Sequence, residues 1–164
     1  MFYIHFKFLV QIGDMFRKLS KVVQHFIFGS FQKKKLYLES LKWSIIVRFS
    51  MVFLPFKFYK RLFGKIQYSN QTVYTVKQLE EAIQISKIVI SLCRNTPWES
   101  KCLVEALSCK RILKKRGIET TVYLGICKNY DGKELAAHAW LKMGDYILTG
   151  RSGHQNFKVV NFYS

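Results

Sequence analysis

Two residues of this chain, Cys102 and His138, have the chemical types and the sequence settings that nucleophilic catalysis requires. Cys102 stands in the first or second turn of a predicted helix, where unpaired backbone amides and the helix dipole favour a thiolate over a thiol. The same amides are placed to accept the oxyanion that forms when a carbonyl carbon is attacked. His138 lies in the segment AAHAWLK, which predicts a strand on which the imidazole and Trp140 share a face. Such a histidine can serve as the base for the thiol if it comes within about 3 Å of the sulfur.

A purely structural role for Cys102 is the alternative. The residue begins an apolar stripe that continues through Ala106, Cys109 and Leu113, and free cysteine is among the most buried residue types. We assign the other three cysteines, Cys93, Cys109 and Cys127, to packing. Their spacing with Cys102 matches no paired C-x-x-C pattern, so no metal site is expected. We also expect no cofactor.

Two helices are expected to precede the predicted strands. Thr75 with Gln78 three residues later forms a capping-box signature, and apolar residues follow at helical spacing, which predicts a helix over about 76–93. The next helix carries Cys102 and ends in a basic turn followed by Gly117. Thr96 or Ser100 is expected to cap its start.

The last third of the chain is rich in short β-type segments. These segments span residues 120–127, 136–143, 146–149 and 157–162, with turn residues at 129–132 and 144–145. Helices followed by an antiparallel sheet predict an α+β fold.

The N-terminal part is basic and rich in aromatic residues. Residues 1–35 have the pattern of one or two basic amphipathic helices, and residues 36–63 form a more apolar helical stretch that Pro55 should divide into two helices. Spanning a bilayer is disfavoured, because the longest uncharged run is far below the ~20 residues required. This stretch either packs on the rest of the protein or lies in a membrane interface. Residues 64–74 are expected to be a linker.

The charge of the chain restricts its partners. There are 27 Lys and Arg against 10 Asp and Glu, and residues 1–66 hold 13 basic and 2 acidic residues. This excess favours an anionic partner, and the interleaved apolar residues favour a membrane surface or a protein. No nucleic acid is expected, because no known binding signature is present. Without a convincing secretory signal, we expect a cytoplasmic protein with reduced thiols, either free or peripheral at the inner membrane face.

The string from PWESKCLVEALSCKRILKKRGIETTVYLGICK through AAHAWLKMGDYILTG resembles a known family. It is similar to the transglutaminase-like leader peptidases of lasso-peptide biosynthesis, the B proteins related to the microcin-processing peptidase. The matching features are a Trp shortly before the Cys, the Cys-Leu-x-x-Ala-Leu helix start, basic residues before Arg-Gly-Ile, and the Ala-His-Ala-Trp strand. The likeness covers roughly residues 36–150.

This resemblance implies a papain/transglutaminase-like cysteine peptidase domain at 36–164, with a helical preamble at 36–63 and a catalytic core at 75–164. It implies that Cys102 attacks the carbonyl at the leader-core junction of a ribosomally made lasso-peptide precursor, and that His138 moves the proton. Its partners would be the precursor peptide, a separate leader-recognition protein and an ATP-dependent lasso cyclase. Residues 1–35 depart from the family pattern as an extra basic segment. This segment would dock the leader-recognition protein, the cyclase or the inner membrane face, or it reflects the choice of start codon, for which Met15 is another candidate.

One departure from the family pattern concerns the third catalytic residue. The family often places an Asp twelve residues after the histidine, where this chain has Gly150. Asp145, Asp131 and Asn161 are candidates that the sequence leaves unassigned, and a backbone carbonyl is another way to orient the imidazole. A catalytically degenerate module that only binds peptide, or a peripheral membrane protein of the same pathway, is therefore the alternative function.

Overall fold

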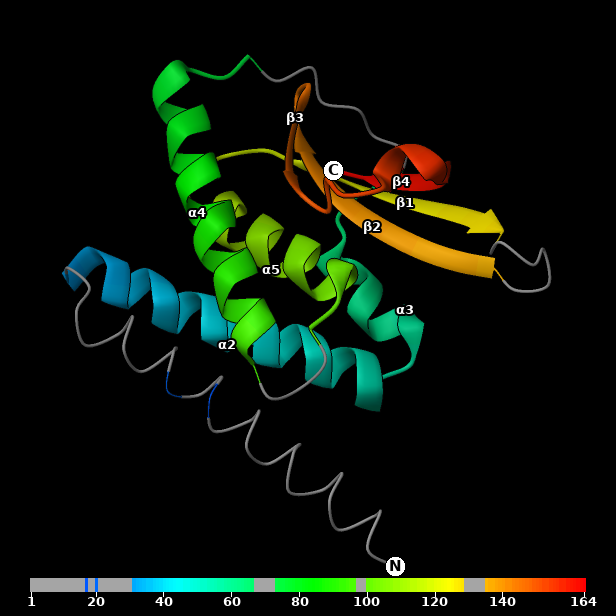
Figure 1. The fold of residues 1–164 in the computed structure, drawn as a ribbon, viewed down its shortest axis with the longest axis horizontal. Coiled ribbons are helices and arrows are strands. Elements are labelled where there is room, and N and C mark those ends of the chain that lie inside the picture. The colour runs from blue at the N-terminus through cyan, green and yellow to red at the C-terminus, as the bar shows by residue number, and fades with distance from the viewer. Residues whose placement is uncertain (1–16, 18–19, 21–30, 67–72, 97–99, 129–134) are drawn as a thin grey trace, which may run out of the picture.

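The computed structural model describes residues 31–66, 73–96, 100–128 and 135–164, together with Arg17 and Ser20. Helices precede an antiparallel sheet along the chain, so the α+β prediction is confirmed (Figure 1). The described elements are α2 (Phe31–Phe53), α3 (Phe56–Tyr59), the 3-10 helix η1 (Lys60–Leu62), α4 (Val76–Asn95), α5 (Cys102–Lys114), β1 (Thr121–Lys128), β2 (Leu135–Met143), β3 (Tyr146–Thr149), the 3-10 helix η2 (His154–Asn156) and β4 (Lys158–Tyr163).

The helix α2 packs on the rest of the protein through a narrow stripe. Ser40, Ser44 and Val47 are buried, and their small size lets α2 approach α4 and α5 closely. Each serine hydroxyl donates to a backbone carbonyl of its own helix, at 2.7 Å for Ser40 and 3.2 Å for Ser44, which makes its burial tolerable. Pro55 separates α2 from α3, as predicted, because it cannot supply the amide proton that would continue the helix.

The helix α2 is continuous from Phe31, and it therefore runs through the position where the predicted N-terminal segment, residues 1–35, ends. The remainder of that segment lies outside the described residues, apart from Arg17 and Ser20, which are helical. Most of the predicted linker, residues 67–72, also lies outside them. In the part of the chain that the structure describes, no helix is both long and apolar enough to cross a membrane.

The capping box predicted for α4 is present. The Thr75 hydroxyl accepts from the Gln78 amide at 3.2 Å, and the Gln78 side chain accepts from the Thr75 amide at 2.9 Å. The helix extends to Asn95, two residues beyond the prediction. Local hydrogen bonding thus fixes the residue at which α4 begins.

The cap predicted for α5 is wrong. The residue at the cap position is Lys101, which makes no capping hydrogen bond with its side chain. Thr96 and Ser100 instead form a hydrogen bond with each other at 2.8 Å, and the Thr96 hydroxyl also lies 2.9 Å from the carbonyl oxygen of Cys93. The end of α5 is as predicted, because Gly117 takes the left-handed conformation, with φ of 70°, that commonly terminates a helix.

The strands form one four-stranded sheet in the order β3-β2-β1-β4, with each neighbouring pair antiparallel. The four predicted strand segments are confirmed to within a residue or two. The hairpin between β2 and β3 turns at Gly144 and Asp145 as predicted, whereas the turn at residues 129–132 lies outside the described residues.

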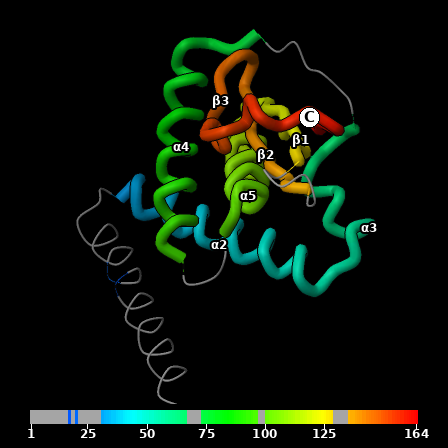
Figure 2. The backbone as a smooth tube through the Cα atoms, turned by 45° about the vertical axis from the view of Figure 1, so that its right-hand side comes forward, coloured from blue at the N-terminus to red at the C-terminus, as the bar shows by residue number. Residues whose placement is uncertain are grey.

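The helix α5 is the centre of the core. Eight of its thirteen residues are buried, and it contacts α2, α4 and three strands (Figure 2). The sheet lies on one side of α5, and α2 and α4 cover other sides (Figures 1 and 2). Because α5 is held on several sides, its N-terminal residue has a fixed position relative to the sheet.

Candidate active site

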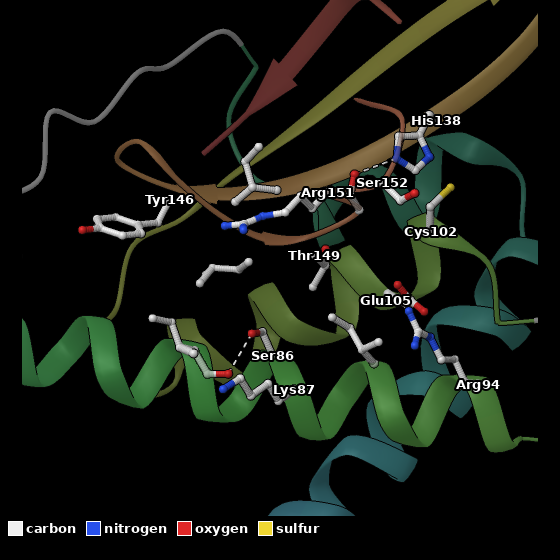
Figure 3. A pocket seen from close by; sticks show the side chains of 15 residues that line it. Ser86, Lys87, Arg94, Cys102, Glu105, His138, Tyr146, Thr149, Arg151 and Ser152 are labelled. Carbon is white, nitrogen blue, oxygen red and sulfur yellow. Dashed lines mark hydrogen bonds between the residues drawn. The ribbon is translucent and has the colours of Figure 1, made fainter. Parts of the chain in front are cut away.

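Cys102 and His138 lie in the same cleft. The cleft has a volume of about 640 Å³ and is walled by α4, by the start of α5 and by the hairpin of β2 and β3. Both side chains are half-buried and line it. Figure 3 shows the sulfur of Cys102 and the imidazole of His138 pointing toward one another at one end of the cleft. The tertiary structure thus brings the two predicted site residues together.

Cys102 is the first residue of α5. The Lys101 carbonyl accepts from the amides of Val104 and Glu105, at 2.9 and 3.2 Å. Among the residues that the structure describes, none accepts a hydrogen bond from the amide of Cys102 itself. The helix that carries the thiol therefore presents its positive end without a side-chain cap, unlike α4, and an anion at this point is favoured.

His138 is oriented by a backbone carbonyl. Its Nε2 atom lies 2.8 Å from the carbonyl oxygen of Gly150. Because a carbonyl oxygen can only accept, Nε2 must carry the proton, and a neutral imidazole then keeps its lone pair on Nδ1. Figure 3 shows this second ring nitrogen on the side of the ring nearer Cys102. This tautomer is the one that can take a proton from the thiol.

Aromatic rings hold the imidazole in place. The centroid of the His138 ring lies 5.0 Å from that of Phe157 and 6.0 Å from that of Trp140, which confirms that His138 and Trp140 share a face. Gly125 lies opposite His138 on β1 and makes room for both rings. A Cβ atom at Gly125 would lie 2.8 Å from Phe157 Cβ and 2.9 Å from Trp140 Cη2.

Gly150 stands where the resembling family often has an Asp, and its surroundings explain why it is glycine. It has φ of 70°, a left-handed conformation that side chains disfavour. A Cβ atom there would collide with the carbonyl oxygen of Ala139 and lie 2.9 Å from Trp140 Cα. The tight packing on β2 that excludes a side chain also brings the Gly150 carbonyl to His138. The sequence shows that position 150 has no acid, but it could not predict that the Gly150 carbonyl orients His138. The direction of a carbonyl depends on the backbone conformation.

The other candidates for orienting His138 are placed differently. Asp145 lies in the turn at the opposite end of the hairpin from Gly150. Asn161 is occupied on β4, where its Nδ2 donates to the Tyr163 hydroxyl at 3.1 Å and its Oδ1 accepts from the Phe162 amide at 2.9 Å. Asp131 lies outside the described residues.

The rest of the cleft carries charges that sequence reasoning did not single out. Burial raises the pKa of Glu105 above its ordinary value, and the positive charge of Arg94 partly offsets this rise. Lys87 and Arg151 are exposed cations that also line the cleft. The cleft therefore combines one half-buried carboxyl group with several basic side chains (Figure 3). These charged residues are spread along the sequence, and only the tertiary structure shows that they line the same cleft.

The remaining cysteines have different environments from Cys102. Cys93 and Cys109 are buried, and burial raises the pKa of Cys93 to about 12 and raises that of Cys109 as well. Such thiols stay protonated and unreactive at neutral pH. Cys127 is half-buried on β1 and does not line the cleft. In the described parts of the chain, no three His, Cys, Asp or Glu residues cluster as metal ligands would.

Comparison with protein families assigns the chain to a superfamily. The family described as the transglutaminase-like superfamily matches residues 50–161, more than half of the chain. The chain therefore belongs to the transglutaminase-like superfamily, which includes cysteine peptidases. Comparisons with curated proteins and with solved structures gave no significant match.

Proposed function

We propose that this protein is a cysteine peptidase that removes the leader from a ribosomally synthesised lasso-peptide precursor, with Cys102 as nucleophile and His138 as base. One observation carries the proposal. The Gly150 carbonyl fixes the proton of His138 on Nε2, in a cleft where the same imidazole faces a cysteine at an uncapped helix start. Membership of the transglutaminase-like superfamily supports the same chemistry.

The reaction follows from these positions. His138 Nδ1 takes the thiol proton as the Cys102 sulfur attacks the carbonyl carbon of the scissile peptide bond. The oxyanion that forms accepts hydrogen bonds from amides at the start of α5. The imidazolium returns the proton to the leaving amine, and a thioester remains on Cys102. Water, deprotonated by His138, then hydrolyses the thioester to a carboxylate and restores the thiol.

The lasso-peptide substrate rests on the sequence resemblance of the Cys102 helix and the His138 strand to the B proteins. In that pathway the freed amine of the core peptide becomes the nucleophile for ring closure by a separate ATP-dependent cyclase. A separate leader-recognition protein delivers the precursor to the cleft.

The test uses the purified full chain, a lasso-peptide precursor and its leader-recognition protein. Mass spectrometry should detect the released leader with the wild-type protein. No released leader should be detected with Cys102→Ala or with His138→Ala. The matched control is Cys127→Ala, which removes a half-buried thiol outside the cleft and should cleave as the wild type does. Circular dichroism establishes that each variant is folded.

Alkylation tests the nucleophile without any substrate. Iodoacetamide should label Cys102 faster than free cysteine at neutral pH, and His138→Ala should slow this labelling. Cleavage that persists in folded Cys102→Ala would refute the proposal. Labelling of Cys102 no faster than free cysteine, with no cleavage, would instead indicate a degenerate module that only binds peptide.

A further inference from the structure

An exposed group of aromatic and aliphatic side chains lies where α2 ends and α3 begins. We call this group the aromatic corner. Its members range from 46% exposed at Leu54 to 71% exposed at Phe53. An apolar patch of this kind marks an interaction site more often than scattered apolar residues do. The aromatic corner consists of Phe49, Val52, Phe53, Leu54, Phe56 and Phe58.

Positive charge accompanies the aromatic corner. Lys57 on α3 and Lys60 and Arg61 in η1, which follows α3 directly, are all exposed. The sequence holds no acidic residue between Glu39 and Glu80, while seven Lys or Arg residues fall in that interval. The surface is therefore both apolar and cationic, which fits an anionic partner with an apolar interior.

We propose that the aromatic corner is a docking surface for an anionic lipid bilayer, in which the phenylalanine rings enter the interface and the cations contact phosphate groups. Lysine is depleted in protein-protein interfaces, because burying its charge is costly. At a bilayer its stem lies along apolar surface while the ammonium group stays at the headgroups. The Lys57 Nζ atom lies 5.0 Å from the centre of the Phe58 ring, so charge and ring already share one site.

The aromatic corner is separate from the cleft and contributes no residue to it. In both backbone views α3 and the adjoining end of α2 lie on the side of the molecule opposite α4 (Figures 1 and 2). Lipid binding at the corner therefore uses none of the residues that line the cleft. The proposal is also independent of peptidase activity.

The experiment is co-sedimentation of the full chain with vesicles of phosphatidylcholine, either alone or with a minority of phosphatidylglycerol. The wild type should sediment with the anionic vesicles, and less so at high salt. Phe53→Glu should lower the partition coefficient by about tenfold, because it replaces an apolar anchor with a repelled charge. Leu135→Glu is the matched control, since Leu135 is 68% exposed on β2 and should bind as the wild type does.

A second pair of variants tests the charges. Lys57→Gln with Lys60→Gln should weaken binding to anionic vesicles by about fivefold for each charge removed. Lys77→Gln, at an exposed lysine of α4, should have little effect. Iodoacetamide labelling of Cys102 should be unchanged in all of these variants, because none lies in the cleft. Circular dichroism establishes that each variant is folded.

Two results would overturn the proposal. If Phe53→Glu and Leu135→Glu bind vesicles equally, another part of the chain makes the contact, and the basic residues 1–30 would be the next to test. If the full chain stays in solution with both kinds of vesicle, no lipid docks at the aromatic corner and its partner is a protein.

Discussion

The Nε2 atom of His138 lies 2.8 Å from the carbonyl oxygen of Gly150, so a backbone group orients the proposed base. A carbonyl oxygen orients the imidazole ring and fixes its tautomer, but it carries no full negative charge. An orienting carboxylate would also stabilise the imidazolium that forms during attack. The proposed peptidase should therefore depend strongly on the exact path of the backbone after β3.

Gly150→Ala tests this dependence. The substitution places a Cβ atom against Ala139 and Trp140 at a left-handed φ, so the free energy of unfolding should fall by about 3 kcal/mol. Displacing the Gly150 carbonyl should also slow iodoacetamide labelling of Cys102 by about tenfold or more. Urea unfolding and labelling kinetics measure the two effects.

Gly153→Ala is the matched control. Gly153 has a similar φ of 75°, but a Cβ atom there would meet nothing within 4 Å. It should lose only about 1 kcal/mol of stability and keep the wild-type labelling rate. Equal labelling rates in folded Gly150→Ala and Gly153→Ala would contradict the orienting role of Gly150.

Arg116 should stabilise the packing of the three long helices. Its guanidinium contacts Glu39 on α2 at 2.9 Å and Glu81 on α4 at 3.2 Å, and it donates to the Ile112 carbonyl at 2.9 Å. Arg116→Ala should lower the free energy of unfolding by about 1 kcal/mol, with a smaller loss at high salt. Lys115→Ala, which removes a more exposed ion pair to Glu39 at 3.6 Å, should cost only about a few tenths of a kcal/mol. Equal losses would argue against a special role for the Arg116 network.

Lys110 should make stability depend on pH. Its Nζ donates to the carbonyls of Thr120 and Tyr163, at 2.6 and 3.3 Å, and burial lowers its pKa from 10.5 to about 8. Between these two values the unfolded chain binds more protons than the folded one, so the contribution of Lys110 to stability rises with pH. It is least favourable below the folded pKa, where both states are protonated.

The variant Lys110→Met isolates this contribution. Urea unfolding of wild type and variant should be compared at about pH 7 and about pH 10. The free energy of unfolding of the wild type, relative to that of the variant, should be higher at the higher pH. Burial raises the pKa of Cys93 and so makes the opposite contribution above pH 9, but this thiol is present in both proteins and cancels. A difference that is the same at both pH values would mean that Lys110 titrates normally.

Features encoded within a few residues were predictable from the sequence. The capping box of Thr75 and Gln78, the break at Pro55 and the left-handed Gly117 each depend on local hydrogen bonds or backbone sterics. The short segments rich in β-type residues likewise predicted the positions of all four strands. The cap predicted for α5 is wrong because the Thr96 hydroxyl donates to the Cys93 carbonyl and shares a second hydrogen bond with the Ser100 hydroxyl. The sequence allowed either arrangement.

The sequence by itself determined the elements, and with them the two residues able to act as nucleophile and base. Only the tertiary structure decided that Cys102 and His138 share a cleft, that Gly150 orients the imidazole and that the aromatic corner stays exposed. The reason is physical. Helix and strand preferences act over neighbouring residues, whereas these relationships depend on how α2, α5 and the sheet pack, which is a property of contacts between distant parts of the chain.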